Sequence, residues 1–254
     1  DAAHAVWLGE AVEAAPSVAG LTDADGRRAI DVAHPTCKQA MQAALFLLGR
    51  FDVDDGPLLH LSATAAVAAA ADRGDPEAKP VPRVALKAMR GVKQDSAELE
   101  VRAGAEQVCA ELKGRVGLDP KRVVAVKAVY ADAKATAGAG GAEAWQLVKD
   151  AAAELGVEAE VKPGLSNSIQ AHFFKTQEVD RPSGETGAPA KLVQQPTQGT
   201  LDASSKYTYL LVMELADRSL ATALMHDRIA ANEWPLVRKI GADLARGLAN
   251  LHVE

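Results

Sequence analysis

The chain has 254 residues, of which 48% are hydrophobic and 24% are charged, a balance that is typical of a globular protein and excludes a disordered chain. Aromatic residues make up only 4% of the chain, so a core built mainly from aliphatic side chains and alanine is expected. The formal net charge of −6 excludes a broad basic surface and therefore disfavours a nucleic-acid partner.

Cysteine and histidine usage narrows the class of protein further. Cys37 and Cys109 match neither a metal-ligand spacing nor a disulfide framework, so two thiols in a reducing compartment are expected, which favours a cytoplasmic location. The six histidines show no ligand spacing, so no metal site is predicted. No apolar run approaches the ~20 residues that a membrane-spanning helix needs, so no membrane span is predicted.

Residues 1–48 are predicted to be helical. Asp25-Gly26 is a strong turn signal, and apolar residues recur at helical spacing from Ala29 to Leu48. A turn followed by a short Ala-x-Asp-x-Ala helix resembles an ankyrin repeat, and an ordinary turn followed by an amphipathic helix explains the pattern equally well. One repeat cannot bury its own apolar face, so the resemblance implies a neighbouring domain or a protein partner for this segment.

The periodicity changes at residue 49, and short strands separated by turns are predicted from there. Three strands are expected at 51–54, 65–71 and 84–86, each bounded by turn residues. A helix is predicted over 96–112, where apolar residues recur on one side. The β-branched run at 122–130 then predicts a fourth strand.

Residues 134–206 differ in composition from the segments on either side and are predicted to form a partly mobile insertion. The glycine-rich run at 137–141 indicates a flexible linker, and a helix is expected over 143–155. After Phe174 the chain is rich in Pro, Gly, Gln, Ser and Thr, a composition that buries little apolar surface.

Regular secondary structure is predicted again from Tyr207 onward. Tyr207–Glu214 predicts a fifth strand, a short helix is expected from Leu220, and an amphipathic helix is expected over 236–251. Together the elements predict an α+β fold in which a five-stranded antiparallel sheet carries one helix.

One strand motif and the order of elements around it are similar to a known family. Val84-Ala85-Leu86-Lys87 matches the Val-Ala-x-Lys strand of protein kinases, and residues 49–254 resemble a kinase small lobe followed by the start of the helical lobe. The resemblance implies ATP as cofactor, with Lys87 on its α- and β-phosphates and a helix glutamate holding the lysine. Glu100 is the candidate glutamate and Glu98 the alternate, because the sequence does not reveal the register of the helix against the sheet.

The resemblance also implies an adenine slot. Leu210–Ala216 resembles the fifth strand and the hinge, which makes Met213 the gatekeeper. The slot is then made of the apolar roof, the gatekeeper and the backbone groups of the hinge, in the order Val67, Ala85, Met213, Glu214 and Ala216. The alternatives are a solvated strand lysine for Lys87, a charged helix face for Glu100 and a core methionine for Met213.

Two departures from the kinase pattern leave the function open. His60, Ser62 and Ala65 stand where the phosphate-covering loop has its glycines. A His-Arg-Asp loop, a metal-binding Asn and an Asp-Phe-Gly motif are absent from these residues, so Mg²⁺ is expected only with a further segment. We therefore expect a fragment of a serine/threonine-type protein kinase that phosphorylates protein but is not catalytically complete as given. The alternative is a non-catalytic ankyrin- or pseudokinase-like subunit that binds within a larger assembly.

Overall fold

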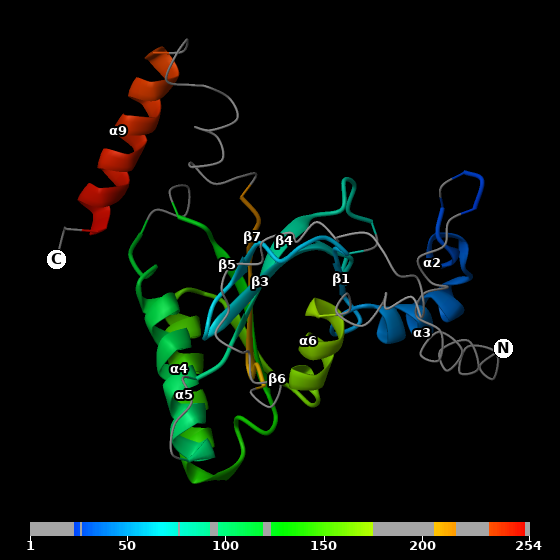
Figure 1. The fold of residues 1–254 in the computed structure, drawn as a ribbon, viewed down its shortest axis with the longest axis horizontal. Coiled ribbons are helices and arrows are strands. Elements are labelled where there is room, and N and C mark those ends of the chain that lie inside the picture. Colours follow the sequence, from blue (N-terminus) through cyan, green and yellow to red (C-terminus); the bar gives the residue numbers. More distant parts are fainter. Residues whose placement is uncertain are drawn as a thin grey trace, which may run out of the picture.

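A computed structural model describes residues 23–25, 27–75, 77–91, 96–118, 123–174, 206–216 and 234–251. Seven strands form one sheet in the order β1-β3-β4-β7-β5-β6, with β2 paired to β3 (Figure 1). The strands are β1 (Phe51–Val53), β2 (His60–Leu61), β3 (Ala65–Asp72), β4 (Arg83–Met89), β5 (Val126–Asp132), β6 (Glu158–Lys162) and β7 (Tyr209–Glu214). The described helices are α2 (Ala29–Val32), α3 (Pro35–Leu45), α4 (Ala97–Lys113), α5 (Gly138–Glu154), α6 (Leu165–Phe173) and α9 (Trp234–Leu251).

The sheet is antiparallel except at one edge. β3 pairs with β4, β4 with β7 and β7 with β5, each in antiparallel register. β6 then pairs with β5 in parallel, because α5 carries the chain back across the sheet between the two strands. Because β7 pairs with both β4 and β5, this strand from late in the chain lies between them at the centre of the sheet.

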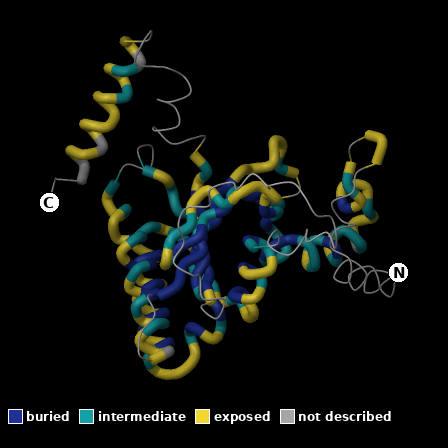
Figure 2. Tube along the Cα trace, in the orientation of Figure 1, coloured by how far each residue is buried: buried dark blue, intermediate teal, exposed yellow. Residues whose placement is uncertain are grey.

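Helices cover both faces of the sheet, so its central strands are buried on both sides. One face packs against α4 and α5, and the other packs against α6. Figure 2 shows the buried strands between these layers. Burial on both sides explains why β4 and β7 are nearly continuous apolar runs rather than alternating ones.

The predicted α+β class is confirmed, whereas the predicted five-stranded antiparallel sheet is wrong. The short strand β2 and the parallel edge strand β6 bring the sheet to seven strands. The predicted linker at 137–141 is also wrong, because α5 begins at Gly138. A side chain at Gly141 would place its Cβ 2.8 Å from the Ala135 carbonyl oxygen, so this glycine serves close packing rather than flexibility.

Much of the predicted insertion is therefore folded, since α5, β6 and α6 occupy residues 138–173. Near the C-terminus the helix expected over 236–251 is present as α9, which stands apart from the sheet in Figure 1. The remainder of the insertion, the predicted short helix from Leu220 and the first 22 residues lie outside the described residues.

The N-terminal helices α2 and α3 sit beside the β1 edge of the sheet (Figure 1). Ile30, Met41 and Phe46 form a small separate core within this segment. Arg28 donates to Asp52 of β1 at 2.8 Å, and Arg73 donates to the same Asp52 oxygen at 2.9 Å. The segment thus contacts the sheet through ion pairs, while its assignment as an ankyrin repeat stays a prediction.

Candidate functional site

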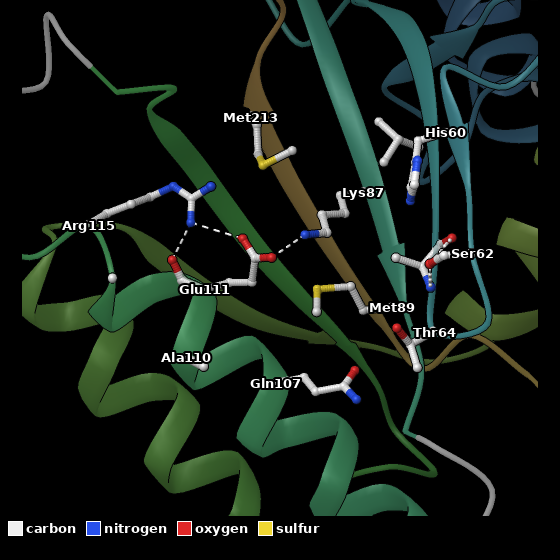
Figure 3. A pocket seen from close by; sticks show the side chains of 13 residues that line it. His60, Ser62, Thr64, Lys87, Met89, Gln107, Ala110, Glu111, Arg115 and Met213 are labelled. Atoms are coloured by element: carbon white, nitrogen blue, oxygen red, sulfur yellow. Dashed lines mark hydrogen bonds and ion pairs between the residues drawn. The ribbon is translucent and has the colours of Figure 1, made fainter. Parts of the chain in front are cut away.

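A cavity of about 680 Å³ opens between the sheet and α4 (Figure 3). Its walls come from the β2–β3 turn, from β4, from the end of β7 and from the second half of α4. The lining residues are His60, Ser62, Thr64, Ala65, Val67, Lys87, Met89, Gln107, Ala110, Glu111, Gly114, Arg115 and Met213.

Strand register brings four of the predicted site residues to the same face of the sheet. Val67 lies directly opposite Lys87, and Ala85 lies opposite Met213, so both pairs face α4. Val67, Lys87 and Met213 line the cavity. Ala85 is only 6% exposed and belongs to the core next to the cavity.

The position of α4 is set by its first turn and by two glycines. Ser96 caps the helix, accepting a hydrogen bond at its Oγ from the Leu99 N–H at 3.3 Å. Gly91, just after β4, lies against this first turn, where an added Cβ would be 1.8 Å from the carbonyl oxygen of Glu100. Gly104 approaches Gly91 from the helix side. This close crossing fixes which residues of α4 face Lys87.

Lys87 forms an ion pair with Glu111. The Lys87 ammonium donates to Oε1 of Glu111, and the two side chains are 18% and 29% exposed. Arg115 donates from Nη1 to the other Glu111 oxygen at 3.0 Å. Burial raises the pKa of the Glu111 carboxyl, but Lys87 and Arg115 outweigh burial, so this pKa lies below its ordinary value of 4.5.

The prediction that Glu100 holds Lys87 is wrong. Glu100 lies in the first turn of α4, beside Gly91, and Glu111 follows it by eleven residues, which is about 16 Å along a helix. The alternate, Glu98, lies in the same first turn. Only the third and fourth turns of the helix pass over the cavity, so neither of the two early glutamates lines it.

Glu214 and Ala216 do not line the cavity. Both are exposed, at and just beyond the end of β7, and the Glu214 N–H donates to the Ala125 carbonyl at 2.9 Å. Their predicted role rests on backbone groups facing a base, and it stays a prediction.

The turn between β2 and β3 closes one end of the cavity without glycine. The Ser62 N–H donates to the Ala65 carbonyl at 2.8 Å, and the Ala65 N–H donates to Ser62 Oγ at 3.1 Å. Arg90 holds the turn from outside: its Nε donates to the Ala63 carbonyl at 2.8 Å and its N–H to the Thr64 carbonyl at 2.9 Å. The Arg90 guanidinium also lies 5.4 Å from the centre of the Tyr207 ring.

Among the cavity residues that sequence reasoning missed are three polar ones, namely Gln107 and Glu111 on α4 and Arg115, which lies two residues beyond the end of that helix. Their spacing of four residues places them on one helix face, a signal that was available in the sequence. Gln107 is notable because its Oε1 is buried without a hydrogen-bond partner among the described residues. The arrangement offers two cations, one carboxylate and one amide oxygen without a partner, around a space that is apolar at its Met213 end.

Neither a cluster of metal-ligating residues nor a membrane-spanning helix occurs among the described residues. Among these residues there is no group of three or more His, Cys, Asp or Glu placed to hold a metal ion. None of the described helices is both long and apolar enough to cross a membrane. Comparison of the chain with family models, with curated proteins and with solved structures yields no match.

Proposed function

We propose that this chain carries the nucleotide-binding small lobe of a protein-kinase-like domain, and that the cavity receives ATP. The observation that carries the proposal is the Lys87–Glu111 pair, which lies in a cavity between a sheet and its covering helix. A lysine held by one carboxylate keeps a fixed direction while its charge still attracts a phosphate oxygen.

Charge at the cavity suits an anionic ligand. Lys87 and Arg115 supply two positive charges against the single negative charge of Glu111, so their sum is one positive charge. Partial burial of these groups weakens solvent screening, which strengthens their attraction for a polyphosphate. The apolar side chains of Met213, at one end of the cavity, and of Val67, opposite Lys87, offer a surface on which a purine can pack.

Strand order is a second support. β7 pairs directly with β4, and Lys87 lies opposite Leu211, so the predicted hinge strand runs beside the lysine strand. The resemblance to kinases calls for this neighbour relation, with Met213 as gatekeeper and Ala85 in the roof of the adenine slot. The chain segment between β4 and β5 forms α4, which supplies the carboxylate.

The turn without glycine is compatible with this proposal. Arg90 and Ser62 fix the turn by hydrogen bonds, so its backbone does not depend on positive φ angles to keep its shape. We propose that a turn held in this way is already positioned over the phosphates and does not change its shape when they bind.

Phosphoryl transfer to a serine or threonine of a protein is the reaction that the proposal assigns to the parent domain, with Mg²⁺ and the catalytic base supplied by a further segment. A cytoplasmic location is part of the proposal, and the free thiols of Cys37 and Cys109 support it.

A non-catalytic binding subunit is the second candidate. The exposed side chains of Trp234, Leu244 and Leu248 on α9 favour it, because such large apolar groups are typical of a surface that a protein partner covers. The N-terminal helices beside the β1 edge offer a further surface of this kind.

Calorimetric titration with ATP tests the nucleotide proposal. The wild-type chain is expected to bind ATP, and Lys87→Ala is expected to weaken binding at least about tenfold, because a charged phosphate contact is lost. Lys127→Ala is the matched control, since Lys127 is an exposed lysine on β5 away from the cavity. Equal binding by the wild type and Lys87→Ala, or no binding by either, would refute the site.

A further inference from the structure

The cavity has a second polar end beyond Lys87. Three rows of paired residues cross the sheet along the length of the cavity. Ala85 lies opposite Met213 in the first row, Lys87 opposite Val67 in the second, and Met89 opposite Ala65 in the third. Successive rows on one face are about 7 Å apart along the strands. The row of Met89 therefore continues the line from Met213 through Lys87 to the far end of the cavity.

Gln107 and Thr64 flank that far end. Gln107 lies one helical turn before Glu111 on α4, and Thr64 lies in the β2–β3 turn. Figure 3 shows the Gln107 amide extending from α4 toward the turn that carries Thr64. The two side chains thus approach the same space from opposite walls.

Gln107 Oε1 is buried and has no hydrogen-bond partner among the described residues. A buried acceptor without a partner carries a free-energy penalty, which a hydrogen-bond donor at that position would remove. The amide carries a donor and an acceptor on one carbon, so a half-turn of the amide presents Nε2 instead of Oε1 to the same space.

We propose that Gln107 is a specificity-determining residue that donates a hydrogen bond to the terminal phosphate of a nucleoside triphosphate. The inference rests on the proposed function, in which the base lies at Met213 and Lys87 contacts the inner phosphates. The next group along that line is the terminal phosphate, whose oxygens accept hydrogen bonds. Glu111 does not oppose it, because Lys87 and Arg115 neutralise its carboxylate.

Titration with ATP and with ADP, without divalent cations, tests this role. Gln107→Met keeps the length of the side chain and removes its polar end, so ATP affinity is expected to fall about tenfold while ADP affinity stays within about twofold. Gln107→Glu keeps the shape but adds a negative charge, and a larger loss of ATP affinity is expected. Gln39→Met is the matched control, because Gln39 is exposed on α3, and it leaves both affinities unchanged.

The outcomes separate the inference from the proposed function. If the wild type binds neither nucleotide, the proposed function fails and the role of Gln107 fails with it. If the wild type binds both and Gln107→Met changes the two affinities equally, or changes neither, the role of Gln107 alone is overturned. A thermal unfolding midpoint for Gln107→Met at or above that of the wild type shows that the variant is folded, because the unpaired amide is gone.

Discussion

Lys87 on β4 and Glu111 on α4 join the sheet to the helix that covers it. The Lys87 ammonium donates to the Glu111 carboxylate, and both side chains are less than a third exposed. Because water reaches the pair only in part, the interaction is screened less than a surface ion pair. The pair therefore fixes the lysine in the cavity and contributes to the docking of α4.

Glu111→Gln tests the contribution of this pair to stability. The substitution keeps the shape of the side chain and removes its charge, so the free energy of unfolding is expected to fall by about 1 kcal/mol near neutral pH. Urea unfolding followed by circular dichroism measures the change. Glu106→Gln is the control, because Glu106 lies on the same helix in an exposed pair with Arg102, and little change is expected there.

The effect of Glu111→Gln on the free energy of unfolding is expected to depend on pH. The pKa of Glu111 is lower in the folded protein than its ordinary value of 4.5, so the unfolded chain binds the proton more readily. The stabilisation is fully present above pH 4.5 and is lost as the pH falls through the folded pKa. The difference in unfolding free energy between the wild type and Glu111→Gln should therefore shrink below about pH 4.5. A constant difference down to pH 3 would contradict this account.

Gly91→Ala is expected to displace α4. An added Cβ would lie 1.8 Å from the Glu100 carbonyl oxygen, so the helix has to shift, and a loss of about 2–3 kcal/mol is expected. The shift should also weaken the Lys87–Glu111 contact and hence nucleotide binding. Gly56→Ala is the matched control, because nothing lies within 4 Å of its added Cβ. Similar unfolding free energies for the two variants would argue against the close crossing.

Arg90→Met tests how the β2–β3 turn is held. The methionine retains the apolar stem over Tyr207 but cannot donate to the Ala63 carbonyl, a bond of 2.8 Å. Loss of about 1 kcal/mol of local stability should speed amide exchange at Ser62 about fivefold. The Asp54 amide, which donates to the Ala69 carbonyl in the middle of β3, should be unaffected. Unchanged exchange at Ser62 would mean that Arg90 does not hold the turn.

Arg50 and Asp72 form a pair at the far edge of the sheet. Arg50 donates from Nε and Nη2 to the two carboxylate oxygens at 2.7 and 2.8 Å, and Asp72 is buried. Arg50→Ala leaves this carboxylate with the Gly74 N–H, so a loss of about 2–3 kcal/mol in chemical unfolding is expected. Arg102→Ala, which removes an exposed pair, is expected to cost less than about 0.5 kcal/mol. Equal effects of the two substitutions would contradict the difference in burial.

Strand positions were predictable where burial leaves a clear pattern. Ala65–Asp72 is a run of small residues, Arg83–Met89 and Tyr209–Glu214 are mostly apolar, and all three occur as strands. Since β-pairing places directly opposite residues on one face, the common face of Val67, Lys87 and Met213 follows once the strand order is known. The sequence shows the lysine strand but not this order.

The partner of Lys87 was not predictable from local patterns, because it depends on where β4 crosses α4. That crossing is set by Gly91 and Gly104, two glycines that approach each other only in the folded chain. The insertion was misjudged for a similar reason. Its glycine-rich run suggests a linker, but packing against Ala135 and Thr136 makes Gly141 part of α5.

Methionine-methyl NMR tests the central claim most directly. Of the four methionines, Met89 and Met213 line the cavity, Met41 packs in the separate N-terminal core, and Met225 lies outside the described residues. On addition of ATP to protein labelled at the methionine methyl groups, the Met213 and Met89 signals are expected to shift while the Met41 signal stays in place. Unmoved Met213 and Met89 signals at saturating ATP would contradict nucleotide binding in this cavity.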